Sequence, residues 1–505
     1  SPQAGAAFGD AFPVSTEDDV HTAVCAAAVC APVVAHAPPQ QVAALLSATA
    51  SNIAALPSSF LALACEETGY DEPRVRGERA RTVEQLDMFA EVVSEGSWRQ
   101  ARIDVARGPG TDLRRIMVPF GGPIAVFAAS NFPLAFSTAG GDTASALAAG
   151  NPVVVKVHPL HPNTNQAVAE AVWEAADATG FPRDVLTLVH GAAPEVGLGL
   201  VRHPAVAGVG FTGSLRAGRA IMDAAAARET PVFVHTEMGS VNPVFVTEEA
   251  LAADWEAIAG GLAASLTMCA GQFCTNPGLT VVCGDASKFL DALARAVGRT
   301  PPHPMLSSGI RDAYEAGAAR LASHRAVEEV TAARPAGGDA AGRVFTVSAA
   351  EFCADTATLQ EEVFGPLGLV VLCDCAEDMA AVAKVLDGQL TASLWAPPSV
   401  AEASPDLVAA LTQMAGRVVF NGFPTGVQVS PAMTHGGPYP ASSSAMHTSV
   451  GSAAIARWVR PVTYQDAPQG ALPPELRDDN PRHVLRMVNG EYTREGIPAM
   501  YTPPK

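Results

Sequence analysis

The pattern of hydrophobic and polar positions divides the chain near Ile116. Before that point, alanine-rich amphipathic segments run from Ser15 to about Val93 and predict a series of helices. The first helix is expected to begin at Ser15-Thr16-Glu17-Asp18-Asp19, where the acidic residues lie near the positive end of the helix dipole. This helical lead-in carries no recognisable chemistry.

After Ile116, short aliphatic runs alternate with helical segments. Runs that are apolar throughout and separated by helices are typical of parallel strands covered on both faces. The first expected strands are Ile124 to Ala129, Val153 to Val157, Val185 to Val189, Val206 to Phe211 and Val232 to Val234, with helices over Ala139 to Ala149 and Asn165 to Thr179. Open sheets of this kind bind ligands at the carboxyl ends of their strands, so a nucleotide-binding domain is predicted here.

A second α/β pattern starts near Val241. Its expected elements are helices over Trp255 to Met268 and Glu377 to Leu386, and strands over Thr280 to Cys283, Leu367 to Leu372 and Arg417 to Phe420. The segment beyond Val462 is rich in proline and charge, and is expected to pack over the surface or against a partner subunit. Two or more domains are predicted, because 505 residues are too many for one hydrophobic core.

Charge and cysteine usage exclude several classes of protein. The net charge of -19 argues against general binding to nucleic acid or to an anionic membrane. Nine cysteines, an odd number without a C-x-x-C pair, indicate reduced thiols rather than a disulfide framework or a metal site. The first residues lack a signal-peptide pattern, and the longest apolar stretches are shorter than the roughly 20 residues that span a membrane. The prediction is a cytoplasmic protein with no metal and no membrane contact.

One candidate nucleophile lies in the segment Gly271 to Gly278, where Cys274 is surrounded by small, turn-forming residues. Such residues let a substrate approach the sulfur closely, and backbone N–H groups can then face a developing oxyanion. A buried, unreactive thiol is the alternative, because free cysteines are commonly small apolar core residues.

Further candidates follow the predicted strands. Glu237 ends an apolar strand, so burial is expected to raise its pKa and suit it to act as a general base for water. Asn131 also follows a strand and is a candidate oxyanion donor. The segment Gly208 to Gly213 matches the G-x-G-x-x-G pattern, and Gly213 to Gly218 opens a helix whose free N–H groups can face a pyrophosphate. A structural glutamate, a turn-capping asparagine and a simple β-α turn are the alternatives.

Six short motifs, taken in their order along the chain, indicate more than any one of them alone. They are Asn131-Phe132-Pro133, Lys156 after Val153-Val154-Val155, Phe211-Thr212-Gly213-Ser214 with Gly218, Glu237-Met238-Gly239, Gly271-Gln272-x-Cys274 and Glu361-Glu362-Val363-Phe364-Gly365-Pro366. Together they resemble the aldehyde dehydrogenase superfamily over roughly Gly121 to Arg460. The segments Met238 to Pro243, Phe420 to Gly426 and Thr434 to Pro440 are similar to the branch that holds α-ketoglutarate semialdehyde (2,5-dioxovalerate) dehydrogenases and NADP-dependent fatty aldehyde dehydrogenases.

The resemblance implies an α/β fold with three parts. These are a Rossmann-type cofactor domain with the helical lead-in (1–238, bridging segment about 101–118), a second α/β catalytic domain (239–430), and a C-terminal return with a small oligomerisation segment and tail (431–505). Family members are commonly dimers or dimers of dimers. A homodimer or a dimer of dimers is therefore expected, with residues 101–118 and 457–465 as the candidate contacts.

The resemblance also implies a role for each motif residue. Cys274 would attack the aldehyde as a thiolate, Asn131 and the Cys274 N–H would hold the oxyanion, and Glu237 would activate the water that hydrolyses the thioester. The cofactor site would consist of Lys156, His158, Gly213, Ser214, Gly218, Glu362 and Phe364. His435, near the expected substrate mouth, is a further candidate for tuning Cys274, with a purely structural histidine as the alternative.

Cofactor preference and substrate are less sharply specified. NAD-preferring members carry a glutamate three residues after the lysine of the adenosine site, and Pro159 stands there in this chain. NADP is therefore predicted, with NAD also possible. The expected reaction oxidises 2,5-dioxovalerate to 2-oxoglutarate, and a medium- or long-chain aliphatic aldehyde is the alternative substrate. A CoA-acylating enzyme is disfavoured because Glu237 offers a base for hydrolysis, and a non-catalytic cofactor-binding protein is the alternative of a different class.

Overall fold

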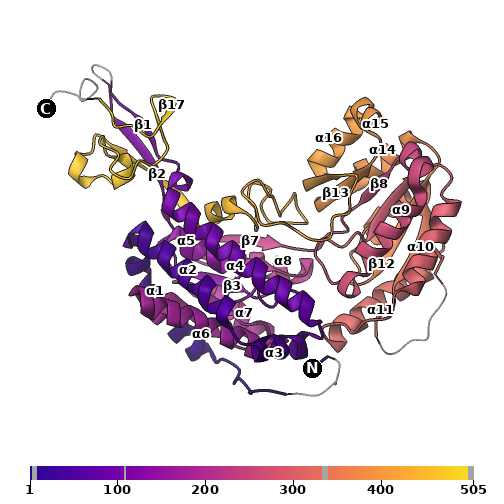
Figure 1. Cartoon of the computed structure of the whole chain (residues 1–505), viewed down its shortest axis with the longest axis horizontal. Coiled ribbons are helices and arrows are strands. Elements are labelled where there is room, and N and C mark those ends of the chain that lie inside the picture. The colour runs from indigo at the N-terminus through magenta and orange to yellow at the C-terminus, as the bar shows by residue number, and fades with distance from the viewer. Residues whose placement is uncertain (3–7, 107–109, 332–338, 499–505) are drawn as a thin grey trace.

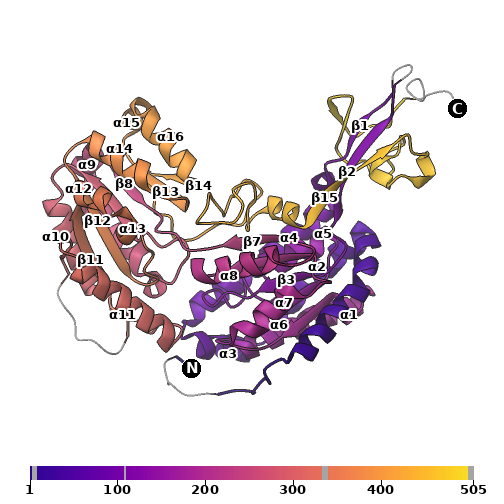
Figure 2. The ribbon, with the colours of Figure 1, turned by 180° about the vertical axis from the view of Figure 1, so that it is seen from behind.

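The structure is a computed structural model that describes residues 1–2, 8–106, 110–331 and 339–498. Its described strands form three sheets of five, seven and five strands. Figures 1 and 2 show the seven-stranded sheet at one end of the molecule and the small sheet that contains β1 and β2 at the other. The fold is α/β with a Rossmann-like part and a second α/β part, as the sequence predicts.

Four helices form the predicted helical lead-in. They are α1 (Glu17–His36), α2 (Pro39–Ala55), α3 (Ser58–Thr68) and α4 (Glu72–Glu95). Thr16 and Asp19 cap the start of α1 reciprocally, so the polar residues before the first apolar face set where the helix begins.

Helix α1 differs from the sequence expectation in one respect. Among the described residues, α1 is the single unbent helix that is long and apolar enough to cross a membrane, by length and composition only. Val20 and Val24 on one face are buried in a core cluster with Val154 of the first sheet, whereas Val29 on another face is exposed. Core helices of soluble proteins pass the same test of length and composition.

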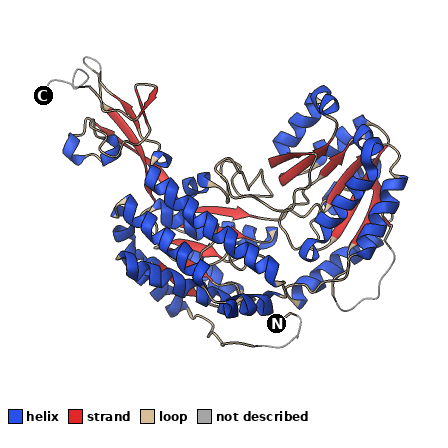
Figure 3. Ribbon diagram, in the orientation of Figure 1, coloured by secondary structure: helices blue, strands red, loops and turns tan. Residues whose placement is uncertain are grey.

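The first sheet has the doubly wound arrangement of a nucleotide-binding domain. Its strand order is β5 (Leu186–Val189), β4 (Val153–Lys156), β3 (Ile124–Phe127), β6 (Gly208–Thr212) and β7 (Phe233–Glu237), and all neighbouring strands are parallel. Helices cover both faces (Figure 3). One face packs against α2, α4, α5 (Gly141–Ala149) and α6 (Pro162–Thr179), and the other against α1, α7 (Pro194–Arg202) and α8 (Leu215–Ala226).

The second sheet contains strands that the hydrophobic pattern did not reveal. Its order is β10 (Glu328–Glu329), β11 (Arg343–Ser348), β12 (Leu367–Cys373), β9 (Leu279–Cys283), β8 (Val244–Val246), β13 (Gln389–Trp395) and β14 (Ala415–Phe420). All neighbouring strands are parallel except β10 and β11. On its two faces lie α9 (Glu248–Thr267) with α10 (Ser287–Arg299), and α11 (Ser308–Ser323) with α14 (Ala376–Val385) and α16 (Pro405–Met414).

The third sheet joins two distant parts of the chain. Its order is β15 (Val459–Gln465), β2 (Leu113–Pro119), β1 (Arg102–Asp104), β16 (Arg486–Val488) and β17 (Glu491–Thr493). The two segments expected to mediate oligomerisation therefore lie in one sheet, although residues 107–109 of the first are outside the described residues. The boundaries expected at 238 and 430 remain a prediction.

Candidate active site

The loop before β9 fixes the position of Cys274. Gly271 has a φ of 64°, and a Cβ there would lie 2.3 Å from the carbonyl oxygen of Gly365, so this tight turn requires glycine. The side-chain amide of Asn242 donates to the carbonyl oxygens of Cys274 at 2.8 Å and of Asn276 at 2.9 Å. The buried side-chain amide of Asn242 therefore holds the loop that carries the Cys274 sulfur.

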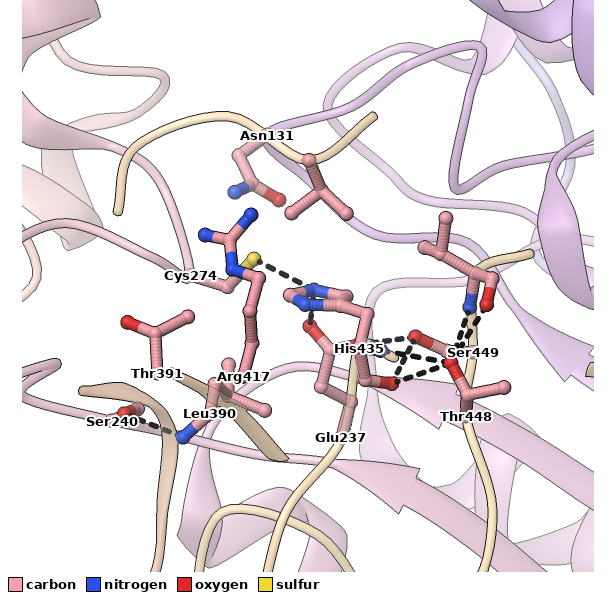
Figure 4. Close-up of polar contacts among 12 residues, drawn as sticks. Asn131, Glu237, Ser240, Cys274, Leu390, Thr391, Arg417, His435, Thr448 and Ser449 are labelled. Carbon is pink, nitrogen blue, oxygen red and sulfur yellow. Dashed lines mark hydrogen bonds and ion pairs between the residues drawn. The ribbon is translucent and has the colours of Figure 1, made fainter. Parts of the chain in front are cut away.

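Three ionisable side chains meet at this loop (Figure 4). The Nε2 atom of His435 lies 3.4 Å from the sulfur of Cys274 and 2.9 Å from Oε1 of Glu237. The Ser449 hydroxyl donates to the second oxygen of Glu237 at 2.7 Å. The end of β7, the loop before β9 and the C-terminal return therefore each contribute one member of the group.

The pKa of Glu237 differs from the sequence expectation. Burial alone raises this pKa, but the electrostatic interaction with His435 and hydrogen bonds from His435 and Ser449 outweigh it, so the pKa lies below its ordinary value. The prediction of a raised pKa is wrong because it considered desolvation without these partners. Glu237 is accordingly a carboxylate at neutral pH.

The same cluster keeps Cys274 protonated at rest. Burial, followed by the negative charge of Glu237 and a hydrogen bond to it, raises the pKa of the Cys274 thiol well above its ordinary value. A thiolate therefore has to form by proton transfer to a neighbour. His435 and Glu237 are the groups in reach, because the ligand atoms of all three residues lie within 4.8 Å of one another.

Asn131 lies on the opposite side of the sulfur from this group in Figure 4. Its side-chain amide donates one hydrogen bond to the carbonyl oxygen of Gln272 at 3.0 Å, two residues before Cys274. Its backbone carbonyl accepts from the Tyr70 hydroxyl at 3.2 Å, which fixes the turn after β3. The amide carries a second hydrogen that suits it to an oxyanion at Cys274.

The carboxyl ends of β4 and β6 carry the expected cofactor residues. Ser214 caps α8, its hydroxyl accepting from the Ala217 N–H at 3.3 Å, and a Cβ at Gly218 would lie 2.6 Å from the sulfur of Met238. At the end of β4, the Lys156 ammonium donates to the carbonyl oxygens of Val157 and Gly191, and burial lowers its pKa to about 8.

Glu362 and Phe364 lie beside the nucleophile loop. Both line a small pocket with Ser240 and Phe273. Burial raises the pKa of Glu362 to about 7, because a backbone hydrogen bond from Ser240 offsets only part of the desolvation. A Cβ at Gly239 would lie 2.3 Å from the carboxylate of Glu362, so glycine is needed there.

Comparison with known proteins identifies this arrangement. The profile of the "Aldehyde dehydrogenase family" matches residues 1–462. The chain belongs to the aldehyde dehydrogenase family. Alpha-ketoglutaric semialdehyde dehydrogenase 2 of Azospirillum brasilense is 45% identical to it over 89% of this chain and 87% of the relative. The alpha-ketoglutaric semialdehyde dehydrogenase of Acinetobacter baylyi is 41% identical over 96% and 94%.

Solved structures agree on the fold. A 1-pyrroline-5-carboxylate dehydrogenase superposes with a TM-score of 0.77 at 21% identity, covering 90% of this chain and 86% of its own. The methylmalonate-semialdehyde dehydrogenase DddC of Oceanimonas doudoroffii gives 0.75 at 20% identity, over 90% and 91%. The family match and the two relatives, rather than these structures, show that this aldehyde dehydrogenase is an oxidoreductase that acts on aldehydes with NAD(P)+.

The residues present fit an NAD(P)+ cofactor. A Cβ at Gly213 would lie 2.5 Å from the Phe211 ring, so the turn into α8 is tight and its N–H groups can face a pyrophosphate. Lys156 ends β4, which β3 separates from β6 in the same sheet, and the Glu362 carboxyl group lies beside the nucleophile loop. These positions suit ribose hydroxyls, which donate hydrogen bonds to carboxylates and accept them from ammonium groups.

Two further features escaped the sequence analysis. Ser449 holds Glu237 and stands in no recognisable motif. Asn242 holds the Cys274 loop and lies in the segment Met238 to Pro243, but nothing in the sequence indicates this role. His435 had a signal, the glycine pair that follows it, but only the folded chain shows that it contacts both Cys274 and Glu237.

Like Cys274, His435 and Glu237, three side chains between α1 and the end of α7 lie close enough together to be considered as metal ligands. His21, Cys25 and His203 place one ligand atom each within 4.8 Å of the others. The Nδ1 atom of His203 accepts from the Ala205 N–H at 3.2 Å, so the proton of this neutral ring belongs on Nε2, which lies 3.0 Å from His21. A His–His hydrogen bond accounts for this contact, and a protonated Nε2 is not a metal ligand.

Proposed function

We propose that this enzyme oxidises 2,5-dioxovalerate to 2-oxoglutarate, with Cys274 as the nucleophile. The observation that carries the catalytic assignment is the triangle of Cys274, His435 and Glu237, with contacts of 3.4 and 2.9 Å. Two relatives support this choice of substrate. They are 45% and 41% identical to this chain over the aligned residues, and both are named for this semialdehyde.

The proposed reaction begins with proton transfer. The Cys274 thiol gives its proton to the His435–Glu237 pair, and the sulfur attacks the aldehyde carbon. Asn131 and the Cys274 N–H hold the resulting oxyanion. NAD(P)+, held by Lys156, Ser214 and Glu362, would supply the hydride acceptor, and Cys274 would then carry the oxidised acyl group as a thioester. Once the first proton has passed from the pair to solvent, Glu237 takes a proton from water as the water oxygen attacks the thioester carbon. The C–S bond breaks, the acid leaves, and the sulfur receives this second proton.

The proposed cofactor preference is NADP+, with NAD+ also accepted. Pro159 offers no carboxylate that would repel a 2′-phosphate. Burial holds the pKa of His158 well below its ordinary value, so this ring supplies a hydrogen bond rather than a positive charge. The measurement is kcat/KM for NADP+ and NAD+ at one aldehyde concentration, and a strong preference for NAD+ would contradict the proposal.

The test of the whole assignment combines one variant with a substrate panel. Cys274→Ala should abolish the dehydrogenase reaction, and near-normal turnover would refute Cys274 as the nucleophile. Wild-type kcat/KM should be higher for 2,5-dioxovalerate than for hexanal and longer aldehydes. Cofactor binding without NAD(P)H formation on any aldehyde would support the non-catalytic alternative.

A homodimer, or a dimer of dimers, is proposed for the assembly. Strands β14 and β15 lie at the edges of their sheets, and Phe420 at the end of β14 is 51% exposed, which suits pairing with another chain. Light scattering after size exclusion measures the mass, and a monomer would overturn this proposal. The cytoplasmic location remains a prediction.

A further inference from the structure

Two arginines near Cys274 lack acidic partners. Arg81 on α4 and Arg417 on β14 form no ion pair with any carboxylate in the part of the chain that the structure describes. Arg74, two turns before Arg81 on the same helix, instead pairs with Glu78 at 2.9 Å. Unpaired guanidinium groups in a protein interior are costly, and therefore they often mark sites for anions.

Both guanidinium groups bind the same short segment, residues 424–427. Arg417 donates to the carbonyl oxygen of Gly426 at 2.9 Å and also to that of Pro424. Arg81 donates from Nε to the carbonyl oxygen of Val427 at 3.3 Å. The two cations therefore converge on the 424–427 segment from different elements.

This segment lies against the nucleophile loop. The Thr425 hydroxyl contacts the carbonyl oxygen of Thr275, the residue after Cys274, at 3.4 Å. In Figure 4 the Arg417 side chain extends toward Cys274. Both Arg81 and Arg417 interact electrostatically with Cys274, which places them within reach of a molecule bound at the sulfur.

Each arginine keeps a buried nitrogen without a hydrogen-bond partner among the described residues. These atoms are Nη1 of Arg81 and Nε of Arg417. Burial, the largest influence on each side chain, lowers the pKa of both guanidinium groups. For Arg81 this burial outweighs the attraction of Glu78 and Glu237, so the surrounding protein compensates its charge only in part.

Aromatic rings line the space beside Arg81. Its guanidinium lies 5.1 Å from the centroid of Phe136 and 5.9 Å from that of Phe132, and Phe136 packs on the His435 ring at 6.1 Å. A substrate at Cys274 therefore meets apolar walls with cationic groups among them. Such walls suit a short aldehyde that carries an anionic group, and they disfavour a long aliphatic chain.

We propose that Arg81 and Arg417 form the subsite that binds the carboxylate of the aldehyde substrate. This inference rests on the proposed function, since 2,5-dioxovalerate carries a carboxylate at the end remote from its aldehyde. A guanidinium–carboxylate contact gives both affinity and orientation, because the two planar groups match in geometry. In this proposal Arg81 and Arg417 determine which aldehyde binds. His435, Glu237 and Asn131 act in the reaction at Cys274.

The test measures a ratio of two substrates on one enzyme. We compare kcat/KM for 2,5-dioxovalerate with kcat/KM for pentanal, which has the same number of carbons and no charge. In Arg81→Gln and Arg417→Gln the ratio should fall about 10- to 100-fold, as expected when a charged hydrogen bond is lost. Arg81→Lys should restore part of it by keeping the charge.

Arg76→Gln is the matched control. Arg76 lies on the same helix and pairs with Glu72 at the surface, so its ratio should equal that of the wild type. Turnover of pentanal shows in each variant that the active site is folded. Glutarate, which carries carboxylates and no aldehyde, should inhibit wild-type pentanal oxidation competitively and should inhibit the two glutamine variants about tenfold more weakly.

The outcomes separate the two proposals. If the wild type favours 2,5-dioxovalerate and the glutamine variants keep that preference and their glutarate inhibition, the subsite is wrong and the proposed substrate stands. A wild type that shows no preference over pentanal and no inhibition by glutarate would overturn both. Loss of the preference in the variants, with pentanal turnover retained, would support both.

Discussion

Two glutamates beside Cys274 occupy different surroundings, and their pKa values move in opposite directions. Glu237 has His435 at 2.9 Å and the Ser449 hydroxyl at 2.7 Å, so its pKa falls below the ordinary value despite burial. Glu362 has a backbone hydrogen bond from Ser240 and little else, so burial raises its pKa to about 7. Burial alone therefore does not predict the charge of a carboxyl group, because the partners decide it.

The difference suits two different tasks. An acid that is ionised at neutral pH, with an imidazole and a hydroxyl beside it, is prepared to take a proton from water. A carboxyl group that titrates near pH 7 changes its hydrogen-bonding capacity over the physiological range, because only the ionised form accepts with both oxygens. The proposed roles of hydrolytic base for Glu237 and ribose ligand for Glu362 follow this division.

The largest expected effect comes from Glu237→Gln. Glutamine keeps the shape and cannot act as a base, so hydrolysis of the thioester should slow about 10²- to 10⁴-fold. Acylation should continue, and NAD(P)H should form in a burst of about one equivalent per active site before a slow steady state. Rapid mixing with absorbance detection measures the burst, and mass spectrometry detects the acyl-enzyme. A steady-state rate near that of the wild type would contradict the role of Glu237.

His435→Phe should give the next largest effect. Without His435 the burial of Glu237 is no longer offset, so the pKa of Glu237 should rise. Glu237 works only when ionised, and therefore the acid side of the pH profile for thioester hydrolysis should move to higher pH. Acylation near neutral pH should fall about 10²-fold, because His435 no longer helps to take the proton of the Cys274 thiol.

His435→Gln is the control for that prediction. It keeps a hydrogen-bond donor and should move the acid side less than His435→Phe does. Superimposable pH profiles for the wild type and His435→Phe would show that His435 does not set the pKa of Glu237.

The sequence predicted the first sheet better than the second. Strands β3, β4, β5 and β6 correspond closely to predicted aliphatic runs, whereas β7 continues beyond its run through His235 and Thr236 to Glu237. Strand β13 is buried but begins with Gln389 and carries Thr391 and Ser393. Gln389 accepts from Ser240 at 2.8 Å and Thr391 donates to Asn242 at 3.0 Å, so these two polar side chains are satisfied by partners about 150 residues away.

The candidate site shows the same limit. Motifs identified Cys274, Glu237 and Asn131, because the type and order of these residues are distinctive. The partners Ser449, Arg81 and Arg417 come from segments far apart in the sequence and stand in no motif. Only the fold brings them to the nucleophile, and it is these partners that determine the pKa of Glu237 and the charge around the proposed substrate.

Glu362→Gln should have a smaller, pH-dependent effect. In the wild type, KM for NAD(P)+ should fall between about pH 6 and pH 8, because Glu362 ionises with a pKa of about 7 and then accepts from ribose hydroxyls more strongly. The glutamine variant should show a KM about tenfold higher at pH 8 and little dependence on pH. Glu361→Gln is the matched control, since Glu361 is exposed and pairs with Arg320 at 3.2 Å. A pH-dependent KM that persists in Glu362→Gln would assign the titration to another group.

Ser449→Ala should have the smallest effect. The hydroxyl donates to Glu237 at 2.7 Å, so its loss should raise the pKa of Glu237 slightly and slow thioester hydrolysis about threefold. The backbone N–H of Ser449 still donates to the carbonyl oxygen of His435 at 2.8 Å, which keeps His435 in place. Ser443→Ala removes a comparable hydroxyl that donates to the carbonyl oxygen of Val234, and should leave hydrolysis unchanged. Equal rates for the two alanine variants would mean that His435 alone offsets the burial of Glu237.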